Sequence, residues 1–227
     1  MSICVHLWFN SPVMCGRFTQ TKSRKDALEE LAGIELPPLF HGRYNIAPMQ
    51  KIAIIRQDAP NRAEECIWGF ENPRSGAPII NARSETLAER PMFKDLLPAN
   101  RCLVPADGFY EWKGKQPYYF QLPEKPIFAF AGLWRNGRCA IITRSADGNM
   151  QGIHHRMPAI LPQNTWSQWI SPSRNATLIS TIVDISVTPV LTIRPVSRRV
   201  NNIANDDPAC LAAAEVQADL SLFPDGE

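Results

Sequence analysis

The sequence predicts one α+β domain, in which antiparallel β-sheets curl into a barrel-like core with a few short helices at its sides. Three observations support this fold. The chain has 227 residues, of which 44% are hydrophobic and 20% charged, a composition that suits one well-packed core. Short apolar segments separated by turn residues, such as Asn136-Gly137, fill the middle of the chain. Helical patterns are few and short.

The predicted elements follow in chain order. A helix is expected over 23–31, with Ser23 as its N-cap and Gly33 as its stop signal. Two further short helices are expected, one of which has Pro91 at its first position. Strands are expected wherever apolar residues gather between turn signals. These helices cover 91–97 and 164–170, and the strands cover 51–57, 65–70, 101–112, 117–122, 127–134 and 139–144.

Charge is distributed unevenly along the chain. Residues 205–227 hold six carboxylates and no Lys or Arg, so that residues 1–204 carry a net charge of +8. A moderately basic body suits a polyanionic partner such as a nucleic acid. Unevenness of this size also arises by chance in proteins that bind no polyanion, so charge alone leaves both interpretations open.

The cysteines and histidines indicate neither a metal site nor a disulfide framework. The six cysteines are far apart, no C-x-x-C is present, and only two of the four histidines are adjacent. A reducing, cytosolic compartment is the simpler expectation. No apolar run reaches the length of a membrane span, so no membrane partner is expected. Motifs for phosphate, dinucleotide or zinc binding are absent, and no cofactor is predicted.

The first 13 residues lack the features of a targeting signal. No Lys or Arg precedes their apolar patch, which His6 and Asn10 interrupt. A lipoprotein signal is also unsuitable, because Met14 occupies the position before Cys15 where a small residue is required. We therefore expect residues 1–13 to be a non-native or cleaved extension, and residues 14–227 to form the domain with an acidic tail at 205–227.

Chemistry-bearing residues gather in five polar islands between the apolar segments. Each island alone has a structural explanation: Asn81 could cap a helix, Glu111 could point outward from a strand, and His154 could lie in a loop. The islands are Cys15-Gly16-Arg17, Tyr44-Asn45-Ile46-Ala47-Pro48, Asn81-Ala82-Arg83-Ser84-Glu85-Thr86, Gly108-Phe109-Tyr110-Glu111-Trp112 and His154-His155-Arg156-Met157-Pro158.

In this order, the five islands resemble the SRAP family, the SOS response-associated peptidases that shield abasic sites in single-stranded DNA. The resemblance runs from Met14 to the segment Pro195-Val196-Ser197-Arg198-Arg199-Val200-Asn201. It implies the SRAP fold and a cytoplasmic monomer at damaged DNA of the nucleoid. It also implies single-stranded DNA with abasic sites as the partner, covalent cross-linking in the SOS response, and self-processing peptidase and abasic-site lyase activities.

The chemistry of such a cross-link requires a cysteine at a free N-terminus. Its amine, with a pKa near ~8, attacks the C1′ aldehyde of an abasic site to give a Schiff base. Its thiol, with a pKa of about 8.5, then closes a five-membered thiazolidine. Ring closure is intramolecular and so benefits from high effective molarity. An internal cysteine has an amide nitrogen and cannot react in this way.

Cys15 is internal in this sequence, whereas the family cysteine directly follows the initiator methionine. Two explanations remain open: Met14 is the true start, or the domain cleaves its own leader before Cys15. A start at Met14 is favoured, because the extension has none of the features of a targeting signal. If the extension is retained, thiazolidine chemistry is impossible.

The resemblance also assigns roles to other residues. Asn81 would hold the Cys15 amine or the opened sugar, Glu111 would shuttle protons, and His154 would act at the sugar oxygen or the thiol. His155 occupies a variable position and receives no role. Six residues are expected to contact DNA. Gly16 would let the backbone approach the sugar closely, Pro48 would form a wall beside the lesion, and arginines would bind phosphates. The six are Gly16, Arg17, Pro48, Arg74, Arg83 and Arg90.

One family feature is missing from the segment between Trp68 and Asn81. Relatives often carry a Trp there that can stack on bases, but residues 71–80 contain no aromatic side chain. Base stacking from this loop is therefore in doubt. Arg74 could substitute through its charge or its planar guanidinium, and Trp68 is expected in the core.

Two other functions remain as alternatives. A cysteine hydrolase of the N-terminal-nucleophile type would use Cys15 Sγ, with its own amine or His154 as base. It needs the same free N-terminus as the cross-linking protein. The two functions differ in their product, which is a hydrolysed amide for the hydrolase and a stable adduct for the cross-linking protein. A plain single-stranded DNA-binding module would need the arginines but not Cys15, Asn81 or Glu111, whose co-occurrence argues against it.

Overall fold

The computed structural model describes residues 15–37, 40–124, 126–172 and 190–214. The expected extension at 1–13 and the last part of the acidic tail, 215–227, lie outside the described residues. The strands are β1 (Arg17–Gln20), β2 (Arg43–Ile46), β3 (Lys51–Arg56), β4 (Ala59–Trp68), β5 (Asn81–Arg83), β6 (Arg101–Ala106), β7 (Gly108–Lys113), β8 (Gln116–Gln121), β9 (Phe128–Arg135), β10 (Arg138–Ser145), β11 (Arg156–Pro158), β12 (Ile160–Leu161) and β13 (Thr192–Pro195).

Helices are short, as the sequence predicts. The α-helices are α1 (Arg24–Glu30), α2 (Pro91–Lys94) and α3 (Gln163–Trp169). Ser23 caps α1, and its side chain accepts a hydrogen bond from the backbone N–H of Asp26. In the described part of the chain, no helix is both long and apolar enough to cross a membrane. The 3₁₀ helices are η1 (Ser84–Thr86), η2 (Gly148–Met150), η3 (Arg198–Asn201) and η4 (Pro208–Leu211).

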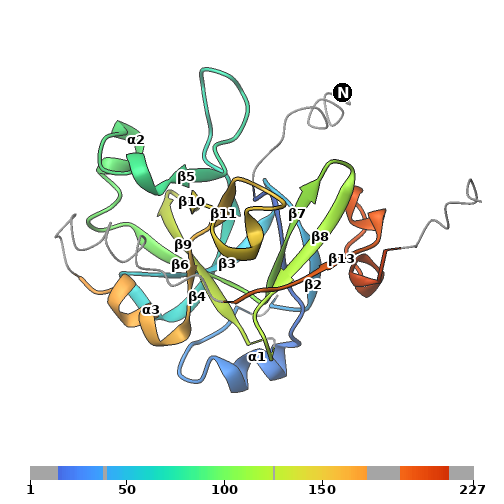
Figure 1. Cartoon of the computed structure of the whole chain (residues 1–227). Coiled ribbons are helices and arrows are strands. Elements are labelled where there is room, and N and C mark those ends of the chain that lie inside the picture. Colours follow the sequence, from blue (N-terminus) through green and yellow to red (C-terminus); the bar gives the residue numbers. More distant parts are fainter. Residues whose placement is uncertain (1–14, 38–39, 125, 173–189, 215–227) are drawn as a thin grey trace, which may run out of the picture.

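The strands form two sheets that lie side by side (Figure 1). The smaller sheet has the order β13-β8-β7-β1-β2, with β1 between β7 and β2. In the larger sheet, pairing runs from β10 through β4, β3, β6 and β9 and back to β10. Part of this sheet is therefore closed into a ring, although the whole is not a clean barrel. The predicted α+β fold with a curled, strand-rich core is confirmed.

Several predicted boundaries need correction. The segment 101–112 is two strands, because the chain breaks at Asp107, whose carboxylate accepts hydrogen bonds from Thr19 Oγ1 at 2.5 Å and Thr21 Oγ1 at 2.6 Å. The strand predicted at 65–70 begins at Ala59 and ends at Trp68. Four of the polar islands, expected between the apolar segments, contribute residues to β1, β2, β5 and β11, and the island at 108–112, which lies inside a predicted strand, forms most of β7.

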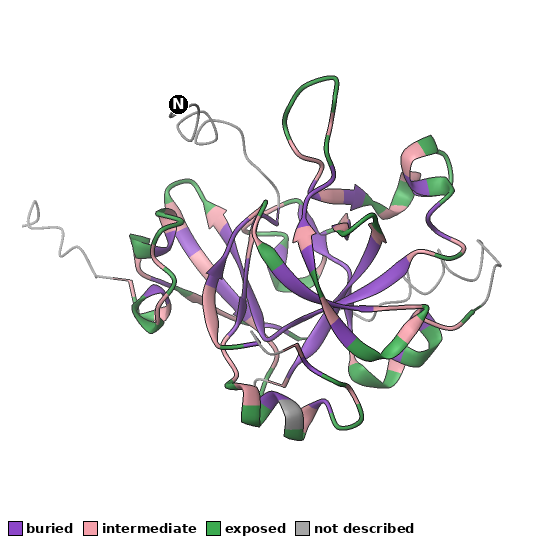
Figure 2. Ribbon diagram, turned by 180° about the vertical axis from the view of Figure 1, so that it is seen from behind, coloured by how far each residue is buried: buried purple, intermediate pink, exposed green. Residues whose placement is uncertain are grey.

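The core lies between and inside the two sheets. Figure 2 shows buried residues along the crossing strands and exposed residues in the helices and connecting loops. The ring of Phe18 from β1 packs edge-on against Trp68 and Phe130 of the larger sheet, at centroid distances of 5.2 and 5.7 Å. Trp68 is fully buried, and its indole N–H donates to the Ile80 carbonyl. This packing fixes β1, and with it the start of the described chain.

Candidate active site

Cys15 and Glu111 form the centre of the candidate site. Strand β1 pairs antiparallel with β7, with Arg17 opposite Tyr110, so that the residues just before β1 run beside Glu111 and Trp112. The backbone nitrogen of Cys15 donates a hydrogen bond of 2.7 Å to Glu111 Oε1. Cys15 has a φ of 46°, a left-handed conformation that is uncommon outside glycine. This turn brings the nitrogen back onto the carboxylate.

Burial dominates the electrostatics of this pair. Both side chains are almost inaccessible to solvent, with 5% exposure for Cys15 and 3% for Glu111. Burial raises the pKa of the Glu111 carboxyl, while the hydrogen bond from Cys15 and the charge of His154 oppose that rise. Burial and the neighbouring Glu111 raise the pKa of the Cys15 thiol, and the charge of Arg156 opposes this. Burial therefore raises the pKa of both groups above that of the same groups in water.

A small pocket opens beside Cys15. Phe18 and Phe109 line it from the smaller sheet, and Ile141 and Pro158 line it from the larger one. Asn81 lies directly opposite Ile141 in the parallel pairing of β5 with β10; the residue is partly exposed, and its Oδ1 is buried. Asn81 is therefore a strand neighbour of Ile141, one of the residues that line the pocket.

His154 approaches the same centre from the segment between η2 and β11. Its backbone N–H donates to the Met150 carbonyl at 3.0 Å, which fixes the turn. Its Nδ1 lies 3.1 Å from the backbone nitrogen of Arg156 and 3.2 Å from the carbonyl oxygen of the same residue. Nε2 is therefore the ring nitrogen that can form a hydrogen bond with a substrate. The His155 ring lies beside the His154 ring at a centroid distance of 4.4 Å.

An ion pair joins two of the islands behind the pocket. Arg156 of β11 binds Glu85 of η1 with both terminal nitrogens, and the Nη2–Oε2 distance is 2.9 Å. Nη2 also donates to the backbone carbonyl of Thr143. Arg156 holds the pKa of the Glu85 carboxyl down at about 2. This pair links the segment that bears Asn81 to the segment that bears His154.

Arg17 is directed into the protein. Its Nη1 donates to Asn45 Oδ1 at 2.8 Å and to the Val200 carbonyl at 2.6 Å, and its guanidinium lies over the Trp112 ring. Burial lowers its pKa to about 10. Its contact with phosphate stays a prediction. In the described chain, these hydrogen bonds join β1 to Asn45 of β2 and to Val200 of η3.

Four of the other predicted DNA contacts reach the surface, and Gly16 does not. Gly16 is buried next to Cys15, and Pro48 is partly exposed in the turn after β2. Arg83 is exposed at the end of β5, and Arg90 is exposed just before α2. Arg74 is exposed in the loop between β4 and β5, which projects from the body at the top of Figure 1. Their contacts with DNA remain predictions.

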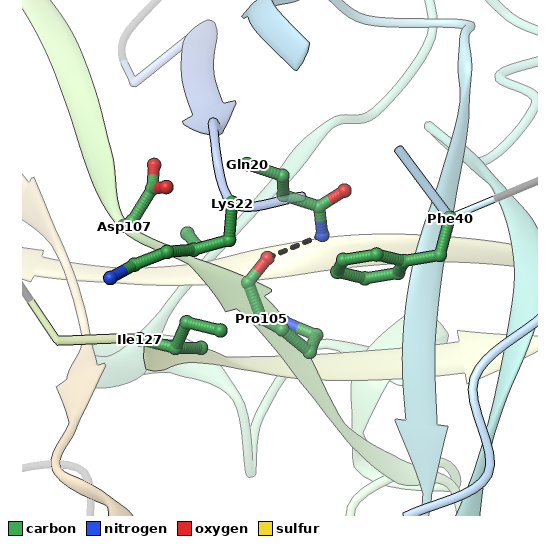
Figure 3. Close-up of a pocket in the computed structure, with 7 residues that line it drawn as sticks. Gln20, Lys22, Phe40, Pro105, Asp107 and Ile127 are labelled. Atoms are coloured by element: carbon green, nitrogen blue, oxygen red, sulfur yellow. Dashed lines mark hydrogen bonds between the residues drawn. The ribbon is translucent and has the colours of Figure 1, made fainter. Parts of the chain in front are cut away.

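A second small pocket is separate from Cys15 and has room for about one water molecule. Gln20, Phe40 and Asp107 lie around it, and the Gln20 amide donates to the Pro105 carbonyl across it (Figure 3). It contains none of the predicted site residues. Among the described residues, no cluster of three or more His, Cys, Asp or Glu side chains is arranged to hold a metal ion.

Comparison with known proteins decides the family. The model of the SOS response associated peptidase (SRAP) family matches residues 14–203. The chain belongs to this family. The match spans all five islands.

Curated relatives of this SRAP chain carry a common name. Over 181 residues it is 38% identical to abasic site processing protein YoqW of Bacillus subtilis, a match that covers 70% of this chain and 81% of the relative. It is 33% identical over 217 residues to abasic site processing protein YedK of Escherichia coli, with 85% and 96% covered. It is 32% identical over 174 residues to abasic site processing protein HMCES of Gallus gallus, with 60% and 50% covered.

Solved structures have the same fold. A protein from Bacteroides thetaiotaomicron superposes with a TM-score of 0.73 at 22% identity, covering 88% of the SRAP chain and 100% of that protein. A phage-related protein from Bordetella bronchiseptica superposes with a TM-score of 0.67 at 30% identity, covering 80% and 94%.

The SRAP site contains residues whose importance sequence reasoning missed. Asn45 is fully buried, and its amide nitrogen donates to three backbone carbonyls, those of Val200, Asn202 and Asn205. Glu85 and Arg156 appeared in the islands but had no assigned role. Each is a polar residue among apolar neighbours in the sequence, and such a local pattern does not identify a partner more than 70 positions away.

Proposed function

We propose that this SRAP chain captures abasic sites in single-stranded DNA by forming two covalent bonds to Cys15. The relatives named abasic site processing proteins support the substrate. The observation that carries the chemistry is the 2.7 Å distance between the Cys15 nitrogen and Glu111 Oε1. It brings a carboxyl that can accept a proton to the atom that must act as the nucleophile.

The reaction proceeds in two bond-forming steps. The Cys15 amine attacks the C1′ aldehyde of the ring-opened abasic sugar, which forms a C–N bond, and loss of one water gives an imine. The thiol then adds across the imine: Sγ bonds to carbon and the thiol proton ends on nitrogen. The product is a five-membered thiazolidine, and the only by-product is water. The two steps balance without an oxidant or a reductant.

Glu111 is the proposed proton shuttle. Burial raises its pKa, so the carboxyl keeps a proton closer to neutral pH than a carboxyl in water does. It can give that proton to the hydroxyl that leaves from the carbinolamine, and it can accept a proton from the amine. His154 Nε2 is proposed to assist at the sugar oxygen, and Asn81 to hold the opened sugar at the edge of the pocket.

The proposal requires that the bond between Met14 and Cys15 is absent in the active protein. Start at Met14 with removal of that methionine, or cleavage of a longer leader by the domain itself, would each provide the free amine. The family match, which begins at residue 14, agrees with either route. The intact mass of the purified protein distinguishes a chain that begins at Met1, Met14 or Cys15.

Cross-linking to an oligonucleotide tests the proposal. Protein that begins at Cys15 is mixed with a single strand that holds one abasic site, and we expect an adduct stable to heat and detergent. Cys15→Ala should abolish it. Cys15→Ser keeps the amine, so it should still form an imine that borohydride traps, but no heat-stable adduct. Cys210→Ala, which removes a buried thiol of η4, is the matched control. An undiminished stable adduct from Cys15→Ala would refute the thiazolidine.

The arginines at the surface are proposed to hold the flanking strand. Arg74, Arg83 and Arg90 are exposed and suit contacts with phosphates, which position DNA without reading its sequence. We extend the proposal to a role in the SOS response and to cleavage of the strand by lyase chemistry after the imine forms. Appearance of a shortened DNA product in the same reactions tests the lyase step.

An amide hydrolase with Cys15 as nucleophile remains the second candidate. It shares the free N-terminus, and no contact in the described chain favours it over aldehyde capture. The product decides between them, because an amide substrate would be turned over many times, whereas an abasic site should consume one protein per lesion.

A further inference from the structure

Arg156 is a buried positive side chain of the larger sheet, on the strand that carries the pocket-lining Pro158. Pro158 lines the Cys15 pocket, and Arg156 lies two positions earlier on the same strand, so that both side chains are on one face of β11. Its side chain is 8% exposed. A buried guanidinium at this position acts on its neighbours through a poorly screened field.

Glu85 and Thr143 fix the guanidinium of Arg156 in place. Glu85 binds both terminal nitrogens, and Thr143 accepts from Nη2 with its carbonyl oxygen at 2.7 Å and its hydroxyl at 3.2 Å. Glu85 itself is nearly half exposed, at 45%. The pair therefore has a buried positive end on β11 and a partly solvated negative end on η1.

We propose that the Glu85–Arg156 ion pair regulates the charge of the Cys15 thiol. Arg156 favours the thiolate that must close the ring, and Glu85 positions the guanidinium and moderates its charge. Arg156 is thus a positioning residue that acts through Cys15. Its relevance to catalysis rests on the function proposed above, but its effect on the thiol does not.

Other charged groups around Cys15 do not replace Arg156. Glu111 on β7 is the negative neighbour and disfavours the thiolate. His154 faces Glu111 and weakens that effect only indirectly. Arg17 on β1 lines the pocket, but its guanidinium is bound to Asn45 and Val200. Of the positive groups, Arg156 is the one whose charge opposes the rise in the Cys15 thiol pKa.

The two members of the pair should change Cys15 in opposite directions. Alkylation by iodoacetamide is measured on the full chain near pH ~8, and the Cys15 peptide is quantified by mass spectrometry, because the thiolate is the reactive form. Arg156→Gln removes the positive charge and should slow alkylation about tenfold, which corresponds to a rise of about one pKa unit. Glu85→Gln leaves Arg156 unneutralised and should accelerate alkylation. Arg156→Lys, which keeps the charge, should stay close to the parent.

A merely structural pair predicts a different pattern. Loss of either partner would then loosen the pocket and change the alkylation rate in the same direction, and this result would overturn the proposal. Arg56→Gln and Glu64→Gln break an ion pair of 2.7 Å elsewhere on the larger sheet and should leave the Cys15 rate unchanged. If Arg156→Gln does not fold, Glu85→Gln decides alone: acceleration supports the proposal, and an unchanged or slower rate refutes it.

The same experiment separates this inference from the proposed function. Iodoacetamide needs neither DNA nor an aldehyde, so the opposite shifts can appear in a protein that fails to cross-link abasic DNA. That combination would refute the proposed function and keep the charge regulation. Normal cross-linking with parallel shifts would do the reverse.

Discussion

The backbone nitrogen of Cys15 lies 2.7 Å from Glu111 Oε1, although 96 positions separate the two residues in the chain. The sheet makes this contact, because β1 and β7 are neighbours and Glu111 projects from the end of their pairing. A buried carboxyl with a raised pKa thus meets a nitrogen whose protonation state decides whether it can attack an aldehyde.

Glu111→Gln should slow cross-linking without preventing it. General acid–base assistance is typically worth about 10²–10⁴-fold, whereas an aminothiol and an aldehyde condense without help. The end-point yield should therefore recover with time, and binding to undamaged single strands should stay near the parent level. A cross-linking time course beside a thermal melt makes the measurement. An unchanged rate with an unchanged melt would remove Glu111 from the chemistry.

Glu85 should stabilise the fold in a pH-dependent way. Arg156 lowers the folded-state pKa of Glu85 from 4.5 to about 2. The unfolded state therefore binds the proton more readily, and the stabilisation is complete above about pH 4.5 and is lost as the pH falls toward about 2. The melting temperatures of parent and Glu85→Gln should converge over this range. Glu29→Gln, on the exposed side of α1, controls for the loss of one carboxylate; a difference that stays constant with pH would contradict the prediction.

Arg83 and Arg17 should behave differently when replaced by alanine. Arg83 is exposed, so Arg83→Ala should leave the melt unchanged and reduce the salt dependence of single-strand binding by about 0.7 per lost phosphate contact. Arg17→Ala should lower stability by about 2 kcal/mol, because it leaves the Asn45 and Val200 oxygens without their charged donor. Binding titrations at several salt concentrations and denaturant unfolding measure both. An Arg17→Ala protein with the parent's stability would show that these inward contacts contribute little.

Asn45→Ala should be among the more damaging polar substitutions in this chain. Three carbonyl groups of 200–205 would lose the amide donor that satisfies them, which costs about 1–3 kcal/mol. Asn61→Ala, at an exposed position of β4, should change stability by less than about 0.5 kcal/mol. Urea unfolding of the two variants provides the comparison, and equal midpoints would contradict a clamping role for Asn45.

The sequence predicted the elements that depend on local signals. Ser23 caps α1 as expected, Pro91 starts α2, and the Asn136-Gly137 turn joins β9 to β10. Short strands such as β5 and β11, with three residues each, are below the length at which alternation can be recognised. Their polar residues therefore appeared to interrupt the sheet when they belong to it.

Long-range polar contacts were beyond the reach of sequence reasoning. The break at Asp107 arises from its bonds to Thr19 and Thr21, which lie almost 90 positions earlier. Motif resemblance selected Cys15 and Glu111 as partners, but no pattern in the chain could place one nitrogen on one carboxylate oxygen. Such contacts come from strand order, which the sequence left open.

The attachment of the 3₁₀ segment at Val200 to Arg17 and Asn45 has a consequence for protein synthesis. Arg17 is synthesised early, whereas Val200, whose carbonyl accepts its hydrogen bond, is synthesised 183 residues later. At 5–20 residues per second this delay is on the order of ten to forty seconds. During that time β1 lacks its final anchor, and the residues around Cys15 are unassembled. The nascent chain thus carries Cys15 well before the contacts of Arg17 with Val200 can form.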